Sequence, residues 1–313
     1  GAAIQEGQAV DSGCAELSRR VIDLVTTGRL GEAEAAIDDA LGNGAKRIQP
    51  VCEGLLLHNL ATIMYLSGRF AEAEAFAERS VSTLEPILGP STTGLLPPLQ
   101  VLVGARLEQG KIGKSREALT KMQRIPLQRA EQRALVHGAA AVLSHSEGRF
   151  TESESEFRSA LVEWERAGKS SGAEIASLLD GLASLYISEE RLDEAARVLD
   201  GALAALTTAP EAVPMDRIRL LQVRAALDQR KGNWRQAERD LEQALALAGA
   251  ELRPDADLQV SMMTDYARLL RNHHRRREAR LVEQQVAALR GHSAMDNTVD
   301  VTELRRKSKF HSK

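Results

Sequence analysis

The sequence predicts an all-α protein built by stacking about seven helical hairpins. Three observations support this prediction. Ala and Leu dominate together with Glu, Gln and Arg, which are strong helix formers, while aromatic residues make up only 3% of the chain. Apolar and polar residues do not alternate clearly before residue 298, so no strand is predicted there. One phrase also recurs about every 42 residues along the chain, which is typical of a repeat protein.

The recurring phrase is a turn followed by an amphipathic segment. It reads SGRFAEAEAFAERSV at 67–81, EGRFTESESEFRSAL at 147–161 and KGNWRQAERDLEQAL at 231–245. Aligning the whole chain on these copies gives seven turns, near residues 28, 68, 110, 148, 190, 232 and 274. Five places after each turn stands a small residue: Ala33, Ala73, Ser115, Ser153, Ala195, Ala237 and Ala279.

This spacing is what two packed helices require. A small side chain at a crossing lets the two helix axes approach closely, and larger residues fill the adjacent holes. Gly in the turn accepts the positive φ that ends the first helix. Glu190 and His274 replace this Gly in two copies, and we expect them to take the same conformation at a modest cost.

These copies resemble the tetratricopeptide repeat. The best matches are LLHNLATIMYLSGRFAEAEAFAERSV from residue 56 and LLDGLASLYISEERLDEAARVLDGAL from residue 178. The period near 42 is similar to the longer repeat of kinesin light chains and many bacterial proteins. The resemblance implies a right-handed superhelical α-solenoid over residues 1–290, followed by a basic extension at 291–313. It also implies a non-catalytic scaffold that binds a protein or peptide in its concave groove.

Prolines and glycines mark the boundary between the second and third hairpins. The segment PILGPSTTGLLPP at 86–98 is predicted to be a loop, with Pro97 and Pro98 opening the next helix.

No catalytic or cofactor motif is present in the sequence. It lacks a Gly-rich phosphate loop, a His-Glu-x-x-His motif and a Gly-x-Ser-x-Gly motif, so no enzyme activity and no cofactor are predicted. The pair His273-His274 is not expected to bind metal, because a site needs three or four converging ligands.

Cys14 and Cys52 occupy nearly equivalent positions in neighbouring first helices. In the stack these two side chains could come close enough for a disulfide, but the spacing does not imply one, and the alternative is two small buried thiols.

The resemblance also places candidate groove residues, because the first helices line the concave face in this family. The positions that the packing pattern leaves free there are Leu55, His58, Thr62, Tyr65, Gln100, Gly104, Leu107, Val142, His145, Asp180, Ser184, Ile187, Arg219, Gln222, Ala226, Arg230, Thr264, Arg268 and Arg271. In the N-terminal half, His58 and Tyr65 are the expected anchors. The C-terminal half carries four arginines on one face: Arg219, Arg230, Arg268 and Arg271. Arginine suits carboxylates, so we expect a peptide with an acidic segment to lie along the groove. The alternative is that these arginines are solvated or paired with neighbouring Asp and Glu.

Asn59 matches one position of the carboxylate clamp that some members of the family carry. Ser18, Ile22, Pro97 and Val101 stand where that clamp needs polar or basic groups, so a chaperone-tail receptor is not predicted.

The distribution of charge along the chain limits the other functions that the sequence allows. The net charge is −3, but residues 271–313 hold eleven Lys or Arg against five Asp or Glu. Nucleic-acid binding through this basic end is disfavoured, because few aromatic residues interleave to stack bases. A ligand- or peptide-responsive regulatory module is the main alternative to a scaffold.

Location and assembly are less constrained by the sequence. The chain contains no long apolar run that predicts a membrane span, and its start at Gly-Ala-Ala slightly favours an exported protein. The uncapped ends of a solenoid can associate with each other, so a homodimer is an alternative to a monomer.

Overall fold

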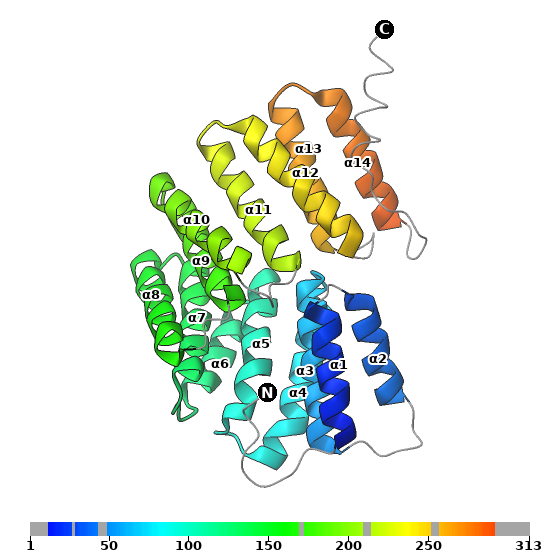
Figure 1. Cartoon of the computed structure of the whole chain (residues 1–313), viewed down its shortest axis with the longest axis vertical. Coiled ribbons are helices and arrows are strands. Elements are labelled where there is room, and N and C mark those ends of the chain that lie inside the picture. The colour runs from blue at the N-terminus through cyan, green and yellow to red at the C-terminus, as the bar shows by residue number, and fades with distance from the viewer. Residues whose placement is uncertain are drawn as a thin grey trace.

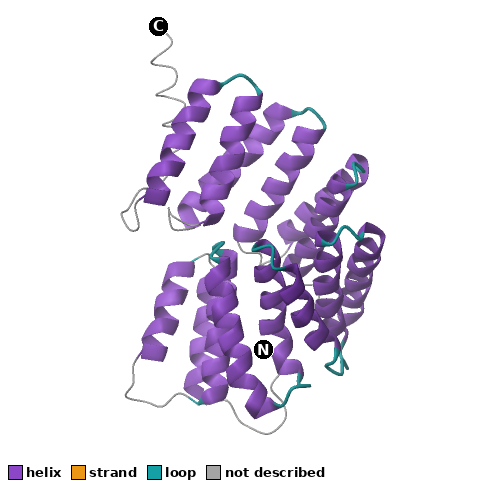
Figure 2. Cartoon of the chain, turned by 180° about the vertical axis from the view of Figure 1, so that it is seen from behind, coloured by secondary structure: helices purple, strands orange, loops and turns teal. Residues whose placement is uncertain are grey.

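The computed structural model describes residues 12–26, 29–42, 49–168, 172–208, 214–251 and 257–291. Within these ranges the chain forms fourteen α-helices, one short 3₁₀ turn and no strand (Figure 2). The predicted all-α class is therefore confirmed, while the predicted extension at 291–313 lies almost entirely outside the described residues. None of the described helices combines the length and apolar character needed to cross a membrane.

The helices pair into seven consecutive hairpins, and each hairpin packs on the next. The pairs are α1 (Ser12–Thr26) with α2 (Leu30–Gly42), α3 (Pro50–Leu66) with α4 (Phe70–Leu88), α5 (Leu96–Glu108) with α6 (Ile112–Gln123), α7 (Ala130–Ser146) with α8 (Phe150–Ala167), α9 (Gly172–Ser188) with α10 (Leu192–Thr208), α11 (Pro214–Arg230) with α12 (Trp234–Glu251), and α13 (Asp257–Asn272) with α14 (Arg276–Gly291). The stack winds into a superhelix (Figure 1).

The crossing inside each hairpin depends on the small residues found in the sequence. Ala33, Ala73, Ala195 and Ala237 are fully buried where the two helices of their hairpins meet. Where serine takes this place, its hydroxyl donates a hydrogen bond to a carbonyl oxygen of the partner helix. Ser115 Oγ lies 3.0 Å from Val103 O, and Ser153 Oγ lies 2.9 Å from Ala141 O. A buried serine is thus tolerated because its polar atom is satisfied.

The predicted turn near residue 28 lies outside the described residues, and the other six take the predicted conformation. Gly68, Gly110, Gly148 and Gly232 all have positive φ. Glu190 and His274, which replace glycine in two turns, adopt φ values of 60° and 62°. Their backbones follow the shape that the stack imposes, although side chains disfavour this region.

The boundary after the second hairpin differs from the prediction. Residues 86–98 were expected to be one loop, but α4 runs through Pro86 to Leu88, and α5 begins at Leu96 with Pro97 and Pro98 in its first turn. A 3₁₀ turn at Thr93–Leu95 fills part of the gap. Pro86 has no N–H to donate to the carbonyl oxygen four residues earlier, and the helix ends two residues after it, at Leu88.

Cys14 of α1 and Cys52 of α3 form a disulfide, with Cα atoms 5.9 Å apart. Both cysteines are buried in a core that also contains Val21, Leu56 and Leu60. The bond joins the first helices of the first two hairpins, so the N-terminal hairpin is covalently held to the stack.

We expect reduction of this disulfide to loosen the first hairpin. Because the bond closes a loop with a sequence separation of 38 residues, its loss should cost about 2–4 kcal/mol. Hydrogen exchange should speed up in α1 and α2 on adding a reductant, and a C14A/C52A variant should show the same rates with or without it. Unchanged exchange in the wild-type chain after full reduction would contradict this expectation.

A second repeated interaction joins consecutive hairpins, and we call it the inter-repeat clamp. A basic residue just after the turn bonds a glutamate on the second helix of the preceding hairpin. The pairs are Arg69 with Glu34, Lys111 with Glu74, Arg191 with Glu154, and Arg275 with Glu238. Three of these cations, the arginines, also bond a glutamate three residues ahead: Glu72, Glu194 and Glu278.

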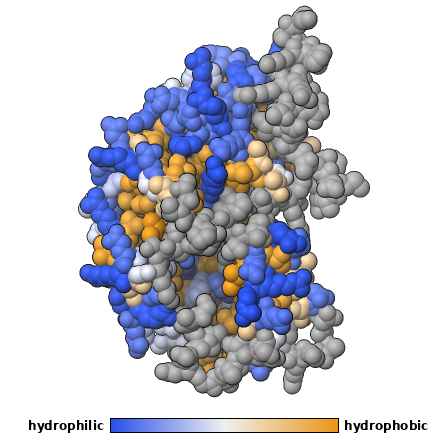
Figure 3. Space-filling model, in the orientation of Figure 1, coloured by the Kyte–Doolittle hydropathy of each residue, from blue (hydrophilic) through white to orange (hydrophobic). Residues whose placement is uncertain are grey.

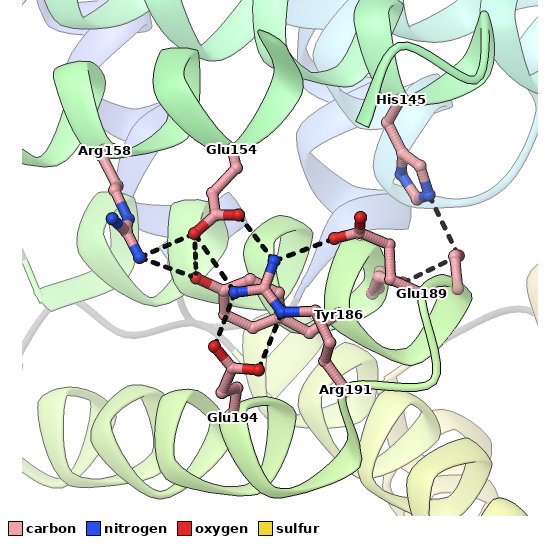
Figure 4. Close-up of polar contacts among 9 residues, drawn as sticks. His145, Glu154, Arg158, Tyr186, Glu189, Arg191 and Glu194 are labelled. Atoms are coloured by element: carbon pink, nitrogen blue, oxygen red, sulfur yellow. Dashed lines mark hydrogen bonds and ion pairs between the residues drawn. The ribbon is translucent and has the colours of Figure 1, made fainter. Parts of the chain in front are cut away.

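Figure 4 shows the most extensive of these clamps. Arg191 Nη1 lies 2.6 Å from Glu154 Oε2, and Arg191 Nε lies 2.7 Å from Glu194 Oε2 (Figure 4). Tyr186 donates its hydroxyl to Glu154 at 2.9 Å, and Arg158 lies within 2.6 Å of the same carboxylate. The hydrogen bond from Arg191 is the largest cause that holds the pKa of Glu154 below its ordinary value.

We expect E154Q to lower stability by on the order of 1–2 kcal/mol at neutral pH, because it removes the charge that these donors share. The pKa of Glu154 is lower in the folded protein than in the unfolded chain. Its contribution is therefore complete above the unfolded value and is lost as pH falls through the folded one. The difference in melting temperature between wild type and E154Q should shrink in acid. E165Q, on the solvent-exposed side of the same helix, is the control and should melt like wild type.

Candidate functional site

A cavity of about 670 Å³ lies on the inner side of the superhelix. Every hairpin from the second to the seventh contributes its first helix to the wall: α3, α5, α7, α9, α11 and α13. Phe70, at the start of α4, adds the one lining residue from a second helix. The volume falls in the range of roughly 300–1,000 Å³ that ligand pockets occupy.

The groove positions inferred from the family resemblance account for much of this wall. Eleven of them line the cavity: Tyr65, Gly104, Leu107, Val142, His145, Asp180, Ser184, Ile187, Arg219, Gln222 and Ala226. Further lining residues were not anticipated: Phe70, Glu108, Ser146, Ser177, Gly181, Val223, Leu258 and Ser261. Most of the latter lie one residue, or one turn, from an anticipated position. They join the wall because the cavity is wider than the single stripe that the repeat pattern defines.

Leu258 reaches the cavity for a different reason, since the superhelix brings its second and seventh hairpins together. A Cβ atom added to Gly68 would lie 2.7 Å from the backbone nitrogen of Leu258. Residues of α1–α3 and of α11–α14 also share one hydrophobic core. Figure 1 shows α11–α14 above α1–α3, with their ends facing each other. We call the contact between the N-terminal half of the superhelix, at α1–α3, and its C-terminal half, at α11–α14, the seam.

Tyr65 and Arg219 meet at the seam inside the cavity. The guanidinium carbon of Arg219 on α11 lies 5.2 Å from the ring centroid of Tyr65 on α3, which is a cation–π contact. Tyr65 also packs edge-on against Phe70, with ring centroids 5.6 Å apart. A Cβ at Gly104 would come within 3.0 Å of the Tyr65 ring, so glycine leaves the room that this ring occupies.

Two carboxyl groups in the cavity lining are influenced by the charge of this arginine. Burial raises the pKa of Asp180 to about 6, and the charge of Arg219 opposes part of that rise. Burial also raises the pKa of Glu108, again against the effect of Arg219. Within the described part of the chain, the buried Oδ1 atom of Asp180 has no hydrogen-bond partner. A carboxylate in this state has unused capacity to accept a hydrogen bond from a ligand.

The other arginines predicted for the groove lie outside the cavity lining and bond to carboxylates of this chain. Arg230 pairs with Glu190, Arg268 with Asp265, and Arg271 with Glu283. All three side chains are exposed, so these pairs are screened and contribute little stability. Of the four arginines, Arg219 is the one that the structure places in the cavity wall.

His58 and Asn59 also lie apart from the cavity lining. Both are half-buried on α3. Burial lowers the pKa of His58 to about 4, so its ring is neutral, and its Nδ1 atom has no partner among the described residues. Tyr65 is therefore the N-terminal anchor that the cavity retains.

His273 has a packing role. Its ring stacks on Trp234, with centroids 4.8 Å apart. The residues that the structure describes contain no group of three or more His, Cys, Asp or Glu arranged to hold a metal ion.

Exposed apolar side chains gather across the middle of the face shown in Figure 3, while hydrophilic residues dominate its upper part. The apolar part of the cavity wall, which includes Leu107, Val142, Ile187, Val223 and Leu258, would give a ligand area to bury.

Two models of the tetratricopeptide repeat match the chain, at residues 55–92 and 178–213. No curated protein matches it by sequence.

Several solved structures share the fold. A Rap protein complexed with the competence and sporulation factor aligns with a TM-score of 0.68 and 12% identity, over 96% of this chain and 77% of its own. The apo form of RapI gives 0.55 and 11%, over 95% and 99% of the two chains. BtubC from P. vanneervenii gives 0.51 and 16%, over 76% and 96%. At these identities the likeness concerns the fold alone.

Proposed function

We propose that this chain, a member of the tetratricopeptide-repeat family, is a non-catalytic scaffold that binds a short peptide segment in the cavity on its inner side. The family assignment rests on the two matched repeats and on the fold. The observation that carries the proposal is the cavity itself, which six consecutive hairpins line with a mixture of apolar and polar groups. Its size suits a few residues of extended chain better than a folded domain.

The Rap complex supports this placement by analogy. That protein has the same fold over nearly the whole of this chain and holds the competence and sporulation factor. Among the residues first inferred for peptide binding, Tyr65 and Arg219 are the two that line the cavity, where they would border the segment. His58, Asn59, Arg230, Arg268 and Arg271 would then act at the margins of the groove, or only in the stability of the stack.

Obstructing the cavity should abolish binding. Ala226 lines it from α11 with an exposed methyl group, so A226W fills part of the space without replacing a core residue. We expect wild type to bind a subset of an immobilised array of randomised heptapeptides, and A226W to lose at least tenfold in affinity for that subset. A71W, at an exposed position of α4 outside the cavity, is the matched control and should bind like wild type. Absence of binding to any peptide, or equal binding by A226W, would reject the proposal.

A ligand-responsive regulatory module is the second candidate, and the seam is the observation that favours it. The cavity is closed where Arg219 meets Tyr65 and where Gly68 meets Leu258, so its walls come from two halves of the superhelix. A ligand that contacts both halves would favour the closed arrangement.

This second candidate predicts a change of shape. Small-angle X-ray scattering should show a smaller radius of gyration when a heptapeptide selected from the array is added to the wild-type chain. The A226W variant should show no change with the same peptide. A radius that stays constant at saturating peptide would favour a rigid scaffold over a responsive module.

A further inference from the structure

The charged groups that face the cavity are mostly acidic. Glu108 comes from α5, Asp180 from α9 and Arg219 from α11. Asp216 lies next to Asp180 on the border of a small void and acts to raise its pKa. Burial lowers the pKa of His145 on α7 and raises that of Tyr65 on α3, so both are neutral near pH 7. The lining therefore holds two carboxyl groups against one guanidinium.

Asp180 contains an atom that can still accept a hydrogen bond. Its Oδ1 atom is buried and has no hydrogen-bond partner within the described residues. The void that it shares with Asp216 and Arg219 has a volume of only about 10 Å³, which is roughly the space of one water molecule. That void is too small for a ligand group, whereas the main cavity, which Asp180 also lines, has room for one. A buried carboxylate without a donor is unfavourable, and a cationic donor would satisfy both its charge and its lone pairs.

We propose that the cavity selects peptides that carry a basic side chain, and that Asp180, assisted by Glu108, binds the Lys or Arg of such a peptide. This inference rests on the proposed function, because it names the chemistry of the segment that occupies the cavity. In this proposal Arg219 does not bind the basic side chain of the peptide, because its guanidinium stays on the Tyr65 ring at the seam. The apolar lining residues then contact the rest of the segment.

An acidic segment fits the structure less well. That hypothesis depended on four arginines along one face, but Arg230, Arg268 and Arg271 bond Glu190, Asp265 and Glu283. An acidic side chain in the cavity would meet Glu108 and Asp180 together with Arg219. Like charges in a poorly solvated site repel one another strongly.

The test uses the full chain and an array of heptapeptides. The central residue is Lys, Arg, Gln or Glu, and the flanking positions are drawn from Ala, Ser and Leu. We expect the Lys and Arg spots to retain at least ten times more protein than the matched Gln spots, with the Glu spots weakest. D180N keeps the shape and removes the charge, so it should lose this preference. D193N, at an exposed carboxylate on α10, makes the same change far from the cavity and should keep it.

Titration at different pH values provides an independent readout. Because the pKa of Asp180 is about 6 in the empty cavity, a cationic peptide should bind more weakly as pH falls from 7.5 to 5 and this carboxylate takes up a proton. Fluorescence anisotropy with the best Lys heptapeptide should show that loss in wild type, and a smaller loss in D180N. An acidic ligand would give the opposite slope.

The outcomes separate the two proposals. Binding that falls equally on Lys, Gln and Glu spots, or that favours Glu, would overturn the basic-group inference and leave peptide binding intact. A preference for Lys that D180N retains would overturn the role of Asp180. Failure of every spot on both this array and the randomised one would overturn peptide binding in the cavity and, with it, this inference.

Discussion

The close crossing of two helices inside each hairpin is the constraint on which the rest of the structure depends. Ala33, Ala73 and Ala195 have no exposed surface, and a larger side chain at any of them would push the paired helices apart. Because seven hairpins share this geometry, each is added to the last with a similar rotation. The repeated rotation produces the superhelix, and the superhelix places the first helices around a common cavity.

Charged residues set how the hairpins meet one another. The inter-repeat clamps join neighbouring hairpins at a fixed place, just after the turn, where a basic side chain reaches back to a glutamate such as Glu34, Glu74 or Glu154. Where the pattern fails, a substitute appears. Position 116 is an arginine, and Glu147 bridges Arg116 and Arg149 instead. The apolar contacts supply most of the stability, and the clamps restrict the register in which those contacts can form.

The sequence predicted those parts of the molecule that local periodicity controls. The turns, the small residues at the crossings and eleven cavity positions all follow from one repeated pattern. The inter-repeat clamp also has a signal in the sequence, because a glutamate six places after a turn recurs with a basic residue just after the next turn. The predicted loop at 86–98 was too long because proline content alone does not reveal that Pro86 lies in a last helical turn.

A local sequence pattern could not predict the contacts at the seam, which join hairpins far apart in the sequence. Nothing in either local sequence relates Gly68 to Leu258, or Tyr65 to Arg219, because their contact depends on the summed rotation of all the hairpins between them. The pairing of Arg268 with Asp265, three residues away, was accessible from helix geometry. That of Arg230 with Glu190 was not, because it joins two hairpins through exposed and flexible side chains.

In the cavity wall, stable packing and the presence of polar groups available to a ligand oppose each other. Packing favours apolar or fully paired groups, whereas the wall contains Asp180, whose buried Oδ1 atom has no hydrogen-bond partner among the described residues, and Glu108, whose pKa is raised by burial. Both groups lower the stability of the empty protein relative to neutral residues of the same shape. The groups that cause this loss of stability lie on the inner wall, away from the helix crossings and inter-repeat clamps that hold the stack together. A ligand that neutralises these carboxylates would therefore stabilise the folded chain through the same contacts by which it is recognised.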